Sequence, residues 1–532
     1  MRLQRWYAAG AILALLYGAL LVAQAATRRP WTDEAIFADA ALTLITKGYL
    51  GCPVVEFATA WPNIARHVYT MFPLDLIVLA GWFRIAGFGL IAQRVLSMLW
   101  TALLLVSVYR LVALLLNDRR VALLCAVLVA FDYHIMVAGA FGRYDPMVAA
   151  LGFGAYVLYL ALRERNLNLA LLLANTSVML CGATHPNGLL YFTGLWVLVF
   201  HLDRRRIRLR QAALCAIPYA VGAAVWSAYL LQDPQSAWAQ LRNNSYSRVA
   251  ILEPWQALRR EVLLRYGPGF GLTRQHSAGS SGPILLKALP LLAYLVSVLG
   301  CLSVRRIRSN PGCRTLLLLT AVHVLYLTFF EGIKFPFYLV HIDPLYAILL
   351  GVFAAWLARA RLAPKWAIAA AVGCVMAVEA GGILWRVHID TYGTQYAPAV
   401  DYVKRHAAPN DLVLASCDFG FGYGFKANLR DDPLLGYDSH RVPQFIVWDV
   451  DAYQDEFDHN AQTKPAAHRY VAEMLRQYDT VFHNAGYTIY RRRPDAAAQP
   501  PSTSGASFSL PRRTSALPIG GTQAPPVKLR EW

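Results

Sequence analysis

Residues 91–116 read IAQRVLSMLWTALLLVSVYRLVALLL, and this stretch decides the fold class. A helix of this length and apolar character can cross the hydrocarbon core of a bilayer, which requires about 20 apolar residues, or somewhat fewer with flanking help. Comparable stretches recur along the chain at Trp6–Ala26, Val121–Ala138, Met147–Leu162, Leu167–Cys181, Leu189–Leu202, Ala212–Leu231, Ile284–Val304, Leu316–Phe330, Phe335–Leu357 and Trp366–Trp385. The sequence therefore predicts an α-helical polytopic membrane protein with about eleven transmembrane helices.

The composition agrees with this fold class. Hydrophobic residues make up 57% of the 532 positions and charged residues only 15%, which excludes an ordinary water-soluble domain. The net charge of +18 comes from short basic clusters between apolar segments rather than from one exposed face, so we predict no nucleic-acid partner. The first span follows Arg2 and Arg5 and lacks a convincing cleavage site, so we interpret it as a retained helix.

Positive residues gather in the cytoplasmic loops of membrane proteins, and this rule assigns a side to every loop. The basic clusters predicted to lie inside are 117–120, 163–165, 204–208, 305–308 and 359–365. The loops predicted to face outward are 27–91, 142–145, 184–188, 232–283 and 331–334. The N-terminus is then inside, and the long first loop is extracytoplasmic.

The segment Met71–Leu90 is apolar enough to be a further span. If it crossed, every later loop would change sides, and Asp145 would lie opposite Asp33. The segment contains Asp75 and Arg84, however, which are costly at the middle of a bilayer. We therefore predict that it lies along the interface as an amphipathic helix or re-enters the membrane.

Beyond Trp385 the composition changes to that of a small soluble domain. We divide the chain into a transmembrane domain (1–385), an extracytoplasmic α/β domain (386–493) and a disordered tail (494–532) without hydrophobic periodicity. Gly420–Gly424 is interpreted as a loop. The elements predicted in the α/β domain are a helix at Pro398–His406, strands at Asp411–Ser416 and Gln444–Asp449, a helix at Ala466–Tyr478 and a hairpin of Thr480–His483 with Tyr487–Tyr490.

The eight cysteines do not form an evident disulfide framework. Most lie in or beside membrane segments without paired spacing and are interpreted as packing residues. Cys52 and Cys417 would lie outside the cytoplasm, where one disulfide between them is an open alternative.

The acidic pair Asp33-Glu34 lies a few residues beyond the first helix, where the chain leaves the membrane. One interpretation is structural, because Thr32-Asp33 suits the start of a helix at Ala35. The other is catalytic, since a carboxylate at a membrane-facing helix start can act as a general base whose pKa is tuned by partial burial. The pair alone leaves both interpretations open.

A second acid, Asp145, lies in the next turn predicted to face outward, Phe141-Gly-Arg-Tyr-Asp-Pro146. It would bring another carboxylate to the same side as Asp33. The alternative is that Arg143 and Asp145 simply pair with each other at a helix start. The membrane context favours a functional role, because ionisable groups there are rare and expensive.

Cationic and polar side chains are predicted at the same level as these acids: Arg94, His185, Lys334, Tyr338 and His341. A positive cluster at an interface could hold a lipid phosphate or pyrophosphate. Taken singly, Arg94 and Lys334 could be snorkelling side chains, His185 a turn residue and Tyr338 part of an interfacial aromatic belt. No zinc-ligand spacing, phosphate-binding glycine loop or nucleophile elbow occurs in a credible context.

This arrangement resembles the polytopic glycosyltransferases of the GT-C class, especially the bacterial relatives of protein O-mannosyltransferases and aminoarabinose transferases. The resemblance covers most of Met1–Trp385, and the outer α/β domain is also typical of several such enzymes. Where many relatives carry a lysine before the sixth span, this chain has His185. The motifs that carry the resemblance are Asp33-Glu34, Phe72-Pro-Leu-Asp75, Ala92-Gln-Arg-Val-Leu-Ser97 and Arg143-Tyr-Asp-Pro146.

The resemblance implies transfer of a sugar from a polyprenyl-phosphate donor to a lipid, glycan or protein acceptor outside the cytoplasm, in the inner (plasma) membrane of a bacterium. Asp33 would deprotonate or orient the acceptor hydroxyl, and Glu34 and Asp145 would orient the acceptor or stabilise charge on the sugar ring. The groups implied to offset charge on the leaving phosphate are Arg143, His185 and Lys334. No cofactor is required, although carboxylates this close could bind a divalent metal.

Two hypotheses from other functional classes are alternatives to an enzyme. A secondary transporter would usually show repeated halves and ionisable or broken-helix sites near the midplane, and the sequence shows neither. A polytopic assembly protein would explain the topology but would give no reason for acids and bases at a common level.

Overall fold

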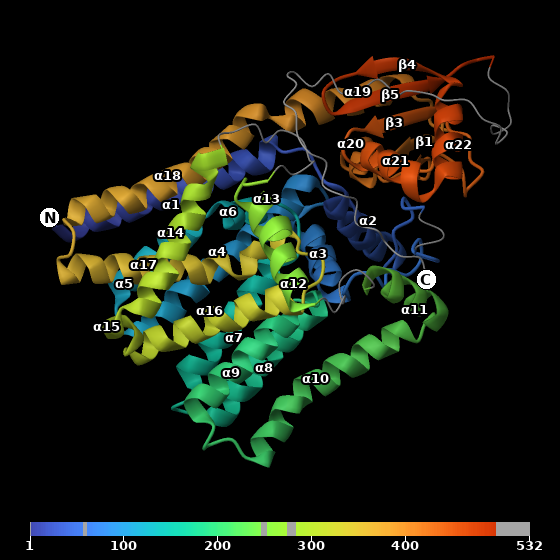
Figure 1. Cartoon of the computed structure of the whole chain (residues 1–532). Helices are drawn as coiled ribbons and strands as arrows, with labels where there is room; N and C mark the ends of the chain where they lie inside the picture. The colour runs from blue at the N-terminus through green and yellow to red at the C-terminus, as the bar shows by residue number, and fades with distance from the viewer. Residues whose placement is uncertain (1, 57–60, 246–252, 274–283, 496–532) are drawn as a thin grey trace.

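The computed structural model describes residues 2–56, 61–245, 253–273 and 284–495. A long helical bundle forms most of the molecule, and a small α/β domain lies at one end of it (Figure 1). The tail predicted to be disordered, 494–532, lies outside the described residues from position 496 onward.

Each apolar stretch predicted to span the membrane is largely helical. The helices long and apolar enough to cross a bilayer in the described residues are α4 (Leu90–Leu116), α7 (Asp145–Leu162), α8 (Leu167–Thr184), α10 (Leu209–Leu230), α14 (Ile284–Ser303), α16 (Pro311–Phe329), α17 (Asp343–Ala360) and α18 (Lys365–Ile389). The bent pairs that could each supply one more span are α1 (Arg2–Thr27) with α2 (Thr32–Lys47), bent by 86°, and α5 (Arg119–Ala130) with α6 (Tyr133–Gly139), bent by 66°. The chain is therefore an α-helical polytopic membrane protein; the number of about eleven spans stays a prediction.

The remaining helices are shorter. The apolar helix α9 (Gly188–Asp203) lies within the bundle, and α3 (Pro73–Ala86) occupies the ambiguous segment Met71–Leu90 without reaching the length of a span. Gly87, with a φ of 83°, ends α3. The placement of α3 at the membrane interface stays a prediction. Further short helices are α11 (Pro234–Ser245), α12 (Pro254–Arg260), the π-helix η1 (Glu261–Tyr266), α13 (Gly267–Gly269) and the 3-10 helix η2 (Pro336–His341).

Glycines let α7 and α9 approach closely. A Cβ at Gly152 of α7 would lie 2.2 Å from the ring of Tyr191, and a Cβ at Gly194 of α9 would lie 2.0 Å from the hydroxyl of Tyr156. Small residues at helix interfaces are typical of membrane bundles, where close backbone approach replaces the hydrophobic effect. This packing brings buried tyrosines of two helices to the centre of the bundle.

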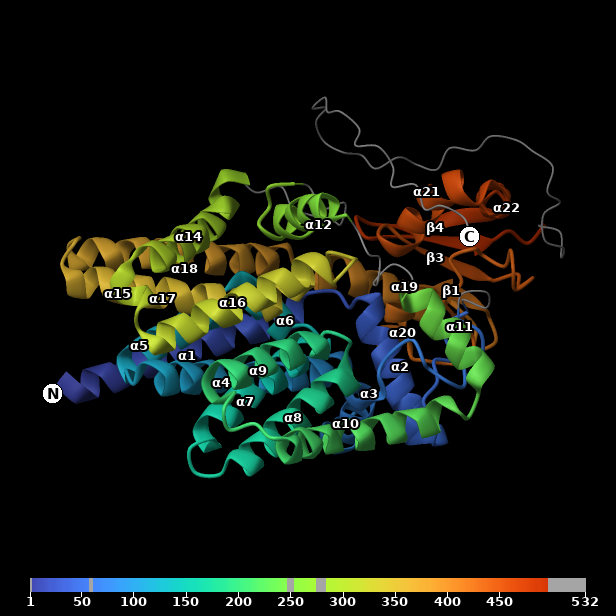
Figure 2. The ribbon, with the colours of Figure 1, turned by 60° about the horizontal axis from the view of Figure 1, so that its bottom comes forward.

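The bundle has two distinct ends. The N-terminus, α15 (Arg305–Arg308) and the turn from α17 to α18 lie at the end away from the α/β domain (Figures 1 and 2). The predicted topology requires this separation, because it places the N-terminus and these basic clusters inside and the α/β domain outside.

The α/β domain contains a five-stranded sheet of order β2-β1-β3-β5-β4. The strand β1 pairs in parallel with β2 and β3, and β5 pairs antiparallel with β3 and β4. The predicted strands, helices and hairpin are all present. The elements are the π-helix η3 (Tyr392–Tyr396), α19 (Ala397–His406), β1 (Val413–Ala415), the 3-10 helix η4 (Cys417–Phe419), α20 (Gly420–Tyr423), β2 (Leu429–Arg430), β3 (Phe445–Asp449), α21 (Ala452–Thr463), α22 (Pro465–Leu475), β4 (Tyr478–His483) and β5 (Tyr487–Arg492).

The interpretation of Gly420–Gly424 as a loop is wrong, because most of it forms the short helix α20. The hydroxyl of Tyr396 accepts a hydrogen bond from the backbone N–H of Gly422 at 2.7 Å and donates to the carbonyl of Asp418 at 2.9 Å. This buried tyrosine holds the glycine-rich turn in place, so a tertiary contact overrides the weak helix propensity of glycine.

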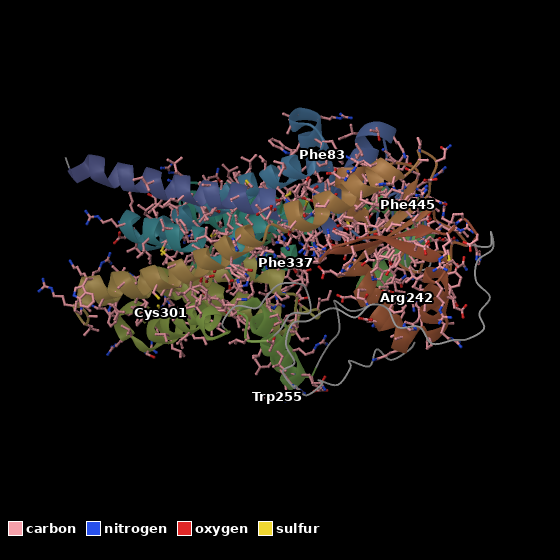
Figure 3. All side chains as sticks on the ribbon, turned by 90° about the horizontal axis from the view of Figure 1, so that it is seen from above. Phe83, Arg242, Trp255, Cys301, Phe337 and Phe445 are labelled. Carbon is pink, nitrogen blue, oxygen red and sulfur yellow. The ribbon has the colours of Figure 1, made fainter. Side chains whose placement is uncertain are left out.

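Ion pairs join the two parts of the molecule. Arg29, just beyond α1, pairs with Asp449 at 3.1 Å and with Asp451. The chain also continues as helix across the predicted boundary at 385/386, since α18 ends only at Ile389, so the division into domains stays a prediction. In Figure 3, Phe337 lies between the bundle, where Cys301 is labelled, and the sheet, where Phe445 is labelled.

All eight cysteines are free thiols. Cys52 and Cys417, for which a disulfide was an open alternative, are both fully buried, and Cys52 donates to the carbonyl of Ile36 at 3.2 Å. They behave as small packing residues.

Candidate active site

Arg143 links two of the predicted acids. Its Nε donates to Asp145 at 2.8 Å, and its Nη1 forms an ion pair with Asp33. The side chains of Arg143 and Asp145 are 3% and 1% exposed, whereas that of Asp33 is 38% exposed. Burial by itself would lower the pKa of Arg143. The attraction of the paired acids outweighs this effect and holds the pKa well above its ordinary value. Of the three groups, only Asp33 is open to a ligand.

Aromatic rings surround the Arg143 guanidinium. It lies 5.1–5.6 Å from the ring centroids of Trp31, Tyr144, Phe335 and Phe337. Because aromatic faces attract a cation and exclude water, they strengthen the ion pairs inside. The guanidinium is therefore held in one place, and with it the carboxylate of Asp33.

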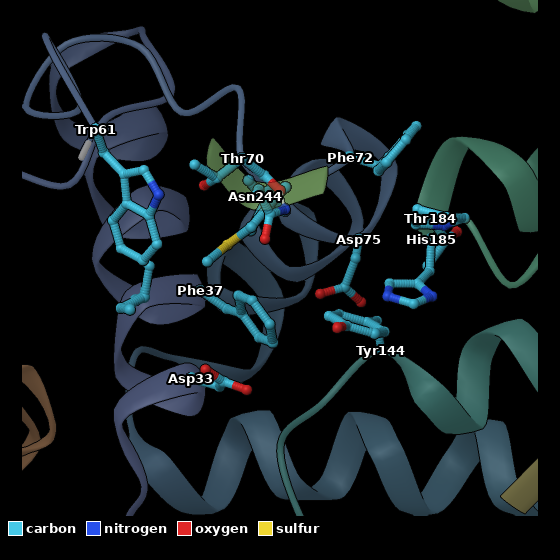
Figure 4. A pocket seen from close by; sticks show the side chains of 14 residues that line it. Asp33, Phe37, Trp61, Thr70, Phe72, Asp75, Tyr144, Thr184, His185 and Asn244 are labelled. Carbon is cyan, nitrogen blue, oxygen red and sulfur yellow. Dashed lines mark hydrogen bonds between the residues drawn. The ribbon is translucent and has the colours of Figure 1, made fainter. Parts of the chain in front are cut away.

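A cavity of about 130 Å³ opens beside this cluster (Figure 4). Asp33 lines one part of it, and Asp75 lines another next to the rings of Tyr144 and His185. The other lining residues come from α2, the loop between α2 and α3, the start of α3, the turn after α8 and the end of α11. The cavity thus brings together segments that are far apart in sequence.

His185 is oriented by its neighbours. Its ring stacks on Tyr144 with centroids 4.5 Å apart, and its Nδ1 accepts the backbone N–H of Asn187 at 3.1 Å. An imidazole that accepts at Nδ1 carries its proton on Nε2, which lies 3.3 Å from the hydroxyl of Tyr338. His185 and Tyr338 therefore form one hydrogen-bonded unit at the edge of the cavity.

The carboxyl of Asp75 belongs to this cavity, although sequence reasoning used it only as an argument about topology. Burial, with a smaller contribution from the nearby Asp145, raises the pKa of Asp75 to about 7. A signal was present in the sequence, because an acid within an apolar segment is a candidate functional residue by default. Tyr144 also lines the cavity, and it lies in the motif Arg143-Tyr-Asp-Pro146 without having been predicted as a site residue.

Replacing Asp75 by Asn is expected to flatten the dependence of stability on pH. The raised pKa means that the folded protein binds more protons than the unfolded chain between about pH 4 and 7, so stability falls as the pH rises through that window. The asparagine variant should lack the contribution of Asp75 to this decrease in the free energy of unfolding, which is on the order of a few kcal/mol. Melting temperatures of both proteins at pH 5 and pH 8 measure it, with Asp479→Asn as a control at an exposed acid.

The predicted site residues Glu34 and Arg94 lie beside the cluster but do not line the cavity. Arg94 contacts both carboxylate oxygens of Glu34, at 2.9 and 2.8 Å, and both side chains are fully buried. Glu34 also accepts the backbone N–H groups of Trp31 at 3.1 Å and Gly142 at 2.7 Å. The pair therefore ties the start of α2 to α4 and to the turn that carries Arg143.

Lys334 and His341 are also outside the cavity lining. Lys334 is 1% exposed, pairs with Glu261 at 3.2 Å and donates to two backbone carbonyls at 2.6 Å. Arg265 pairs with the same Glu261 and with Glu331. His341 is fully buried, with its Nδ1 3.0 Å from the hydroxyl of a tyrosine on α9. The structure brings neither residue to Asp33.

A second, larger cavity of about 700 Å³ lies between the ends of α1 and α3, the start of α4 and the α/β domain. Its lining is largely apolar and includes Trp82, Phe88, Tyr392 and Phe421. None of the predicted site residues lines it. Its chemistry suits a hydrocarbon group rather than a charged one.

Comparison with known proteins gives a match only at the level of the fold. No protein-family model matches this chain, and no curated protein does. Two solved structures of ArnT from Cupriavidus metallidurans are similar to it, one bound to undecaprenyl phosphate, with a TM-score of 0.57, and one in the apo state, with a TM-score of 0.55. Each is 12% identical to this chain, and each alignment covers 92% of this chain and 98% of the other.

ArnT is an aminoarabinose transferase of the GT-C class. The likeness runs through the bundle and the α/β domain together, since it spans nearly all of both chains. At this level of identity a structural match establishes the fold and leaves the activity to the residues of the site. This chain is an integral membrane protein with the fold of the GT-C glycosyltransferases.

Proposed function

We propose that this chain is a glycosyltransferase that moves a sugar from a polyprenyl-phosphate-linked donor to an acceptor hydroxyl outside the cytoplasm of a bacterium. The fold shared with a protein solved with undecaprenyl phosphate supports the class of donor. The observation that carries the proposal is the geometry of Asp33, the open carboxylate of a buried ion cluster at the edge of a cavity. A transferase of this kind needs such a group to receive a proton.

In the proposed reaction, Asp33 accepts the proton of the acceptor hydroxyl. The acceptor oxygen forms a bond to the anomeric carbon as the bond from that carbon to the phosphate oxygen breaks. The polyprenyl phosphate leaves with the electron pair, and attack opposite the leaving group inverts the anomeric centre. Arg143 holds Asp33 in position through their ion pair, and Asp145 holds Arg143 from the other side.

The other cavity groups are assigned to the donor. The Nε2–H of His185 would meet the negative charge that grows on the phosphate as it leaves, and Arg143, which is buried beside the cavity, would stabilise that charge from a distance. Asp75, whose pKa is about 7, can offer a hydrogen-bond donor to the same region while it is protonated. Glu34 and Arg94 would position α2 without touching the substrate.

Binding of the donor's lipid phosphate tests the class of substrate. Undecaprenyl phosphate should raise the melting temperature of the purified full-length protein in detergent, and undecaprenol, which lacks the phosphate, should raise it much less. Native mass spectrometry of the same samples should show one bound undecaprenyl phosphate. Equal effects of the phosphate and the alcohol would contradict a phosphate-binding donor site.

The proposed topology places the α/β domain outside and α15 inside. In a variant without the exposed Cys374, Thr480→Cys in β4 should react with a membrane-impermeant thiol reagent in intact spheroplasts. Ser309→Cys, next to α15, is the matched control and should react only after the membrane is permeabilised. The reverse pattern would overturn the topology, because both positions are exposed on the molecule.

A further inference from the structure

A group of potential metal ligands lies in the bundle apart from Asp33. Its members are Asp132, His134 and Asp343, whose ligand atoms all lie within 4.8 Å of one another. Asp132 and His134 lie at the break between α5 and α6, and Asp343 begins α17. The three residues are 1%, 9% and 0% exposed, so they are not a solvated acidic patch.

The hydrogen bonds of His134 favour a ligand at its Nδ1. Its Nε2 lies 3.1 Å from the carbonyl oxygen of Gly269 and can only donate there, so one proton of the ring is on Nε2. Nδ1 lies 2.7 Å from a carboxylate oxygen of Asp343, which is a hydrogen-bond distance, and an ion bound here would replace that contact. In a metal-bound histidine, the nitrogen that does not bind the ion usually donates to a backbone carbonyl or a carboxylate, as Nε2 of His134 does to Gly269.

Among the described residues, the carboxylates of this group have no lysine or arginine partner, and the side chain that pairs with Asp343 is His134. Oδ1 of Asp343 has no hydrogen-bond partner in that part of the chain. Glu379 of α18 interacts electrostatically with both aspartates and is 7% exposed. Its Oε2 accepts the backbone N–H of Tyr133 at 3.2 Å, and its Oε1 has no partner among the described residues.

We propose that Asp132, His134 and Asp343, with Glu379 beside them, bind a divalent transition-metal ion, Zn²⁺ in the first place. A dication would offset the buried negative charge, which is otherwise costly in a medium of low dielectric constant. The imidazole favours zinc or another transition metal over calcium and magnesium, which prefer oxygen ligands alone. Oδ1 of Asp343 and Oε1 of Glu379, which have no hydrogen-bond partner among the described residues, are the oxygens that would bind such an ion.

The ion would connect the two segments that carry the candidate active site. α6, which starts beside Asp132, ends at Gly139, and Arg143 follows in the next turn. Asp343 lies two residues beyond the end of η2, which contains Tyr338. The site would therefore fasten the Arg143 turn and the Tyr338 segment to each other without contacting the substrate. The proposal does not depend on the transferase activity.

Metal content tests the proposal directly. Full-length protein in detergent, with its affinity tag removed, is treated with EDTA, loaded with Zn²⁺, desalted and analysed by mass spectrometry for metals. The wild type should retain about one zinc ion per chain, and Asp343→Asn should retain almost none. Asp33→Asn is the matched control and should retain zinc like the wild type.

Zinc that persists in Asp343→Asn, or is lost in Asp33→Asn, would overturn the assignment. So would a wild type that binds no zinc. If Asp343→Asn fails to fold, Tyr294→Phe serves instead, because it removes only the hydroxyl that donates to Asp132 at 2.7 Å. It should weaken zinc binding by about 10-fold to 100-fold.

The wild-type protein offers a second measurement that needs no variant. X-ray absorption at the zinc edge should show nitrogen and oxygen ligands at about 2.0–2.2 Å, with the outer scattering of one imidazole. Sulfur ligands at about 2.3 Å would instead assign the ion to cysteines and contradict the site.

Discussion

Replacing Asp33 by Asn is expected to reduce sugar transfer by about 10²–10⁴-fold, because the amide cannot accept the proton of the acceptor hydroxyl. The protein should still insert and accumulate normally. Arg143 keeps its contact with Asp145 in the variant, and the side chain of Asp33 is already partly exposed. The product is measured in membranes from cells that express either protein, by mass spectrometry of envelope lipids, glycans and proteins.

The control for this variant is Asp39→Asn. Asp39 lies in the same helix, α2, but is 2% exposed and accepts the backbone N–H of Val54 at 3.2 Å instead of lining the cavity. An asparagine there can still accept that hydrogen bond, so transfer should stay near the wild-type level. Undiminished transfer in Asp33→Asn would remove the role of general base from Asp33, and equal losses in both variants would point to a defect of α2 as a whole.

Arg94→Met is expected to cause the largest loss of stability, about 3–5 kcal/mol. The substitution leaves the carboxylate of Glu34 buried without its ion pair. It also removes the donors that Arg94 provides to the carbonyls of Ala25, Arg28 and Arg29 at 2.6, 2.7 and 3.2 Å. A charge without a partner in a fully buried position is among the most destabilising changes a side chain can make.

Thermal unfolding in detergent measures this loss. Arg493→Met is the matched control, since Arg493 pairs with Asp479 where the side chains are 47% and 60% exposed, and a surface ion pair contributes at most about 1 kcal/mol. The double variant Arg94→Met with Glu34→Gln should recover part of the stability, because it removes the uncompensated charge. A melting temperature of Arg94→Met equal to that of the wild type would show that the pair does not hold α2 in place.

Much of the secondary structure could be predicted from the sequence. The spanning stretches from Trp6–Ala26 to Trp366–Trp385 are largely helical, and the strands at Val413–Ala415 and Phe445–Asp449 lie within the predicted strands Asp411–Ser416 and Gln444–Asp449. These are local properties, because hydropathy over the length of a helix or strand decides whether a segment can be buried. The short helix at Gly420–Tyr423 was missed because its stability comes from the hydroxyl of Tyr396.

The site was only partly predictable. Asp33, Arg143, Asp145, His185 and Tyr338 were expected at one level. The structure joins them through ion pairs and hydrogen bonds, and Asp33 and His185 line the cavity. Lys334, also expected there, is paired with Glu261 of η1, a contact that the sequence did not indicate. Asp75 was not predicted as a site residue and was used only as evidence that Met71–Leu90 does not cross the membrane, yet it lines the cavity.

The sequence by itself determined that this protein is a helical membrane protein and that Asp33, Glu34 and Asp145 lie just beyond the ends of predicted spans. Only the tertiary structure decided which charge meets which. Arg143 and Asp33 are 110 residues apart and Arg94 and Glu34 are 60 apart, so no local pattern could distinguish a helix cap from an ion pair. In a buried environment the nearest opposite charge decides what an acid does. In the folded chain, Glu34 is fully buried and its ion pair with Arg94 links α2 to α4, whereas Asp33 stays partly exposed and open to a ligand.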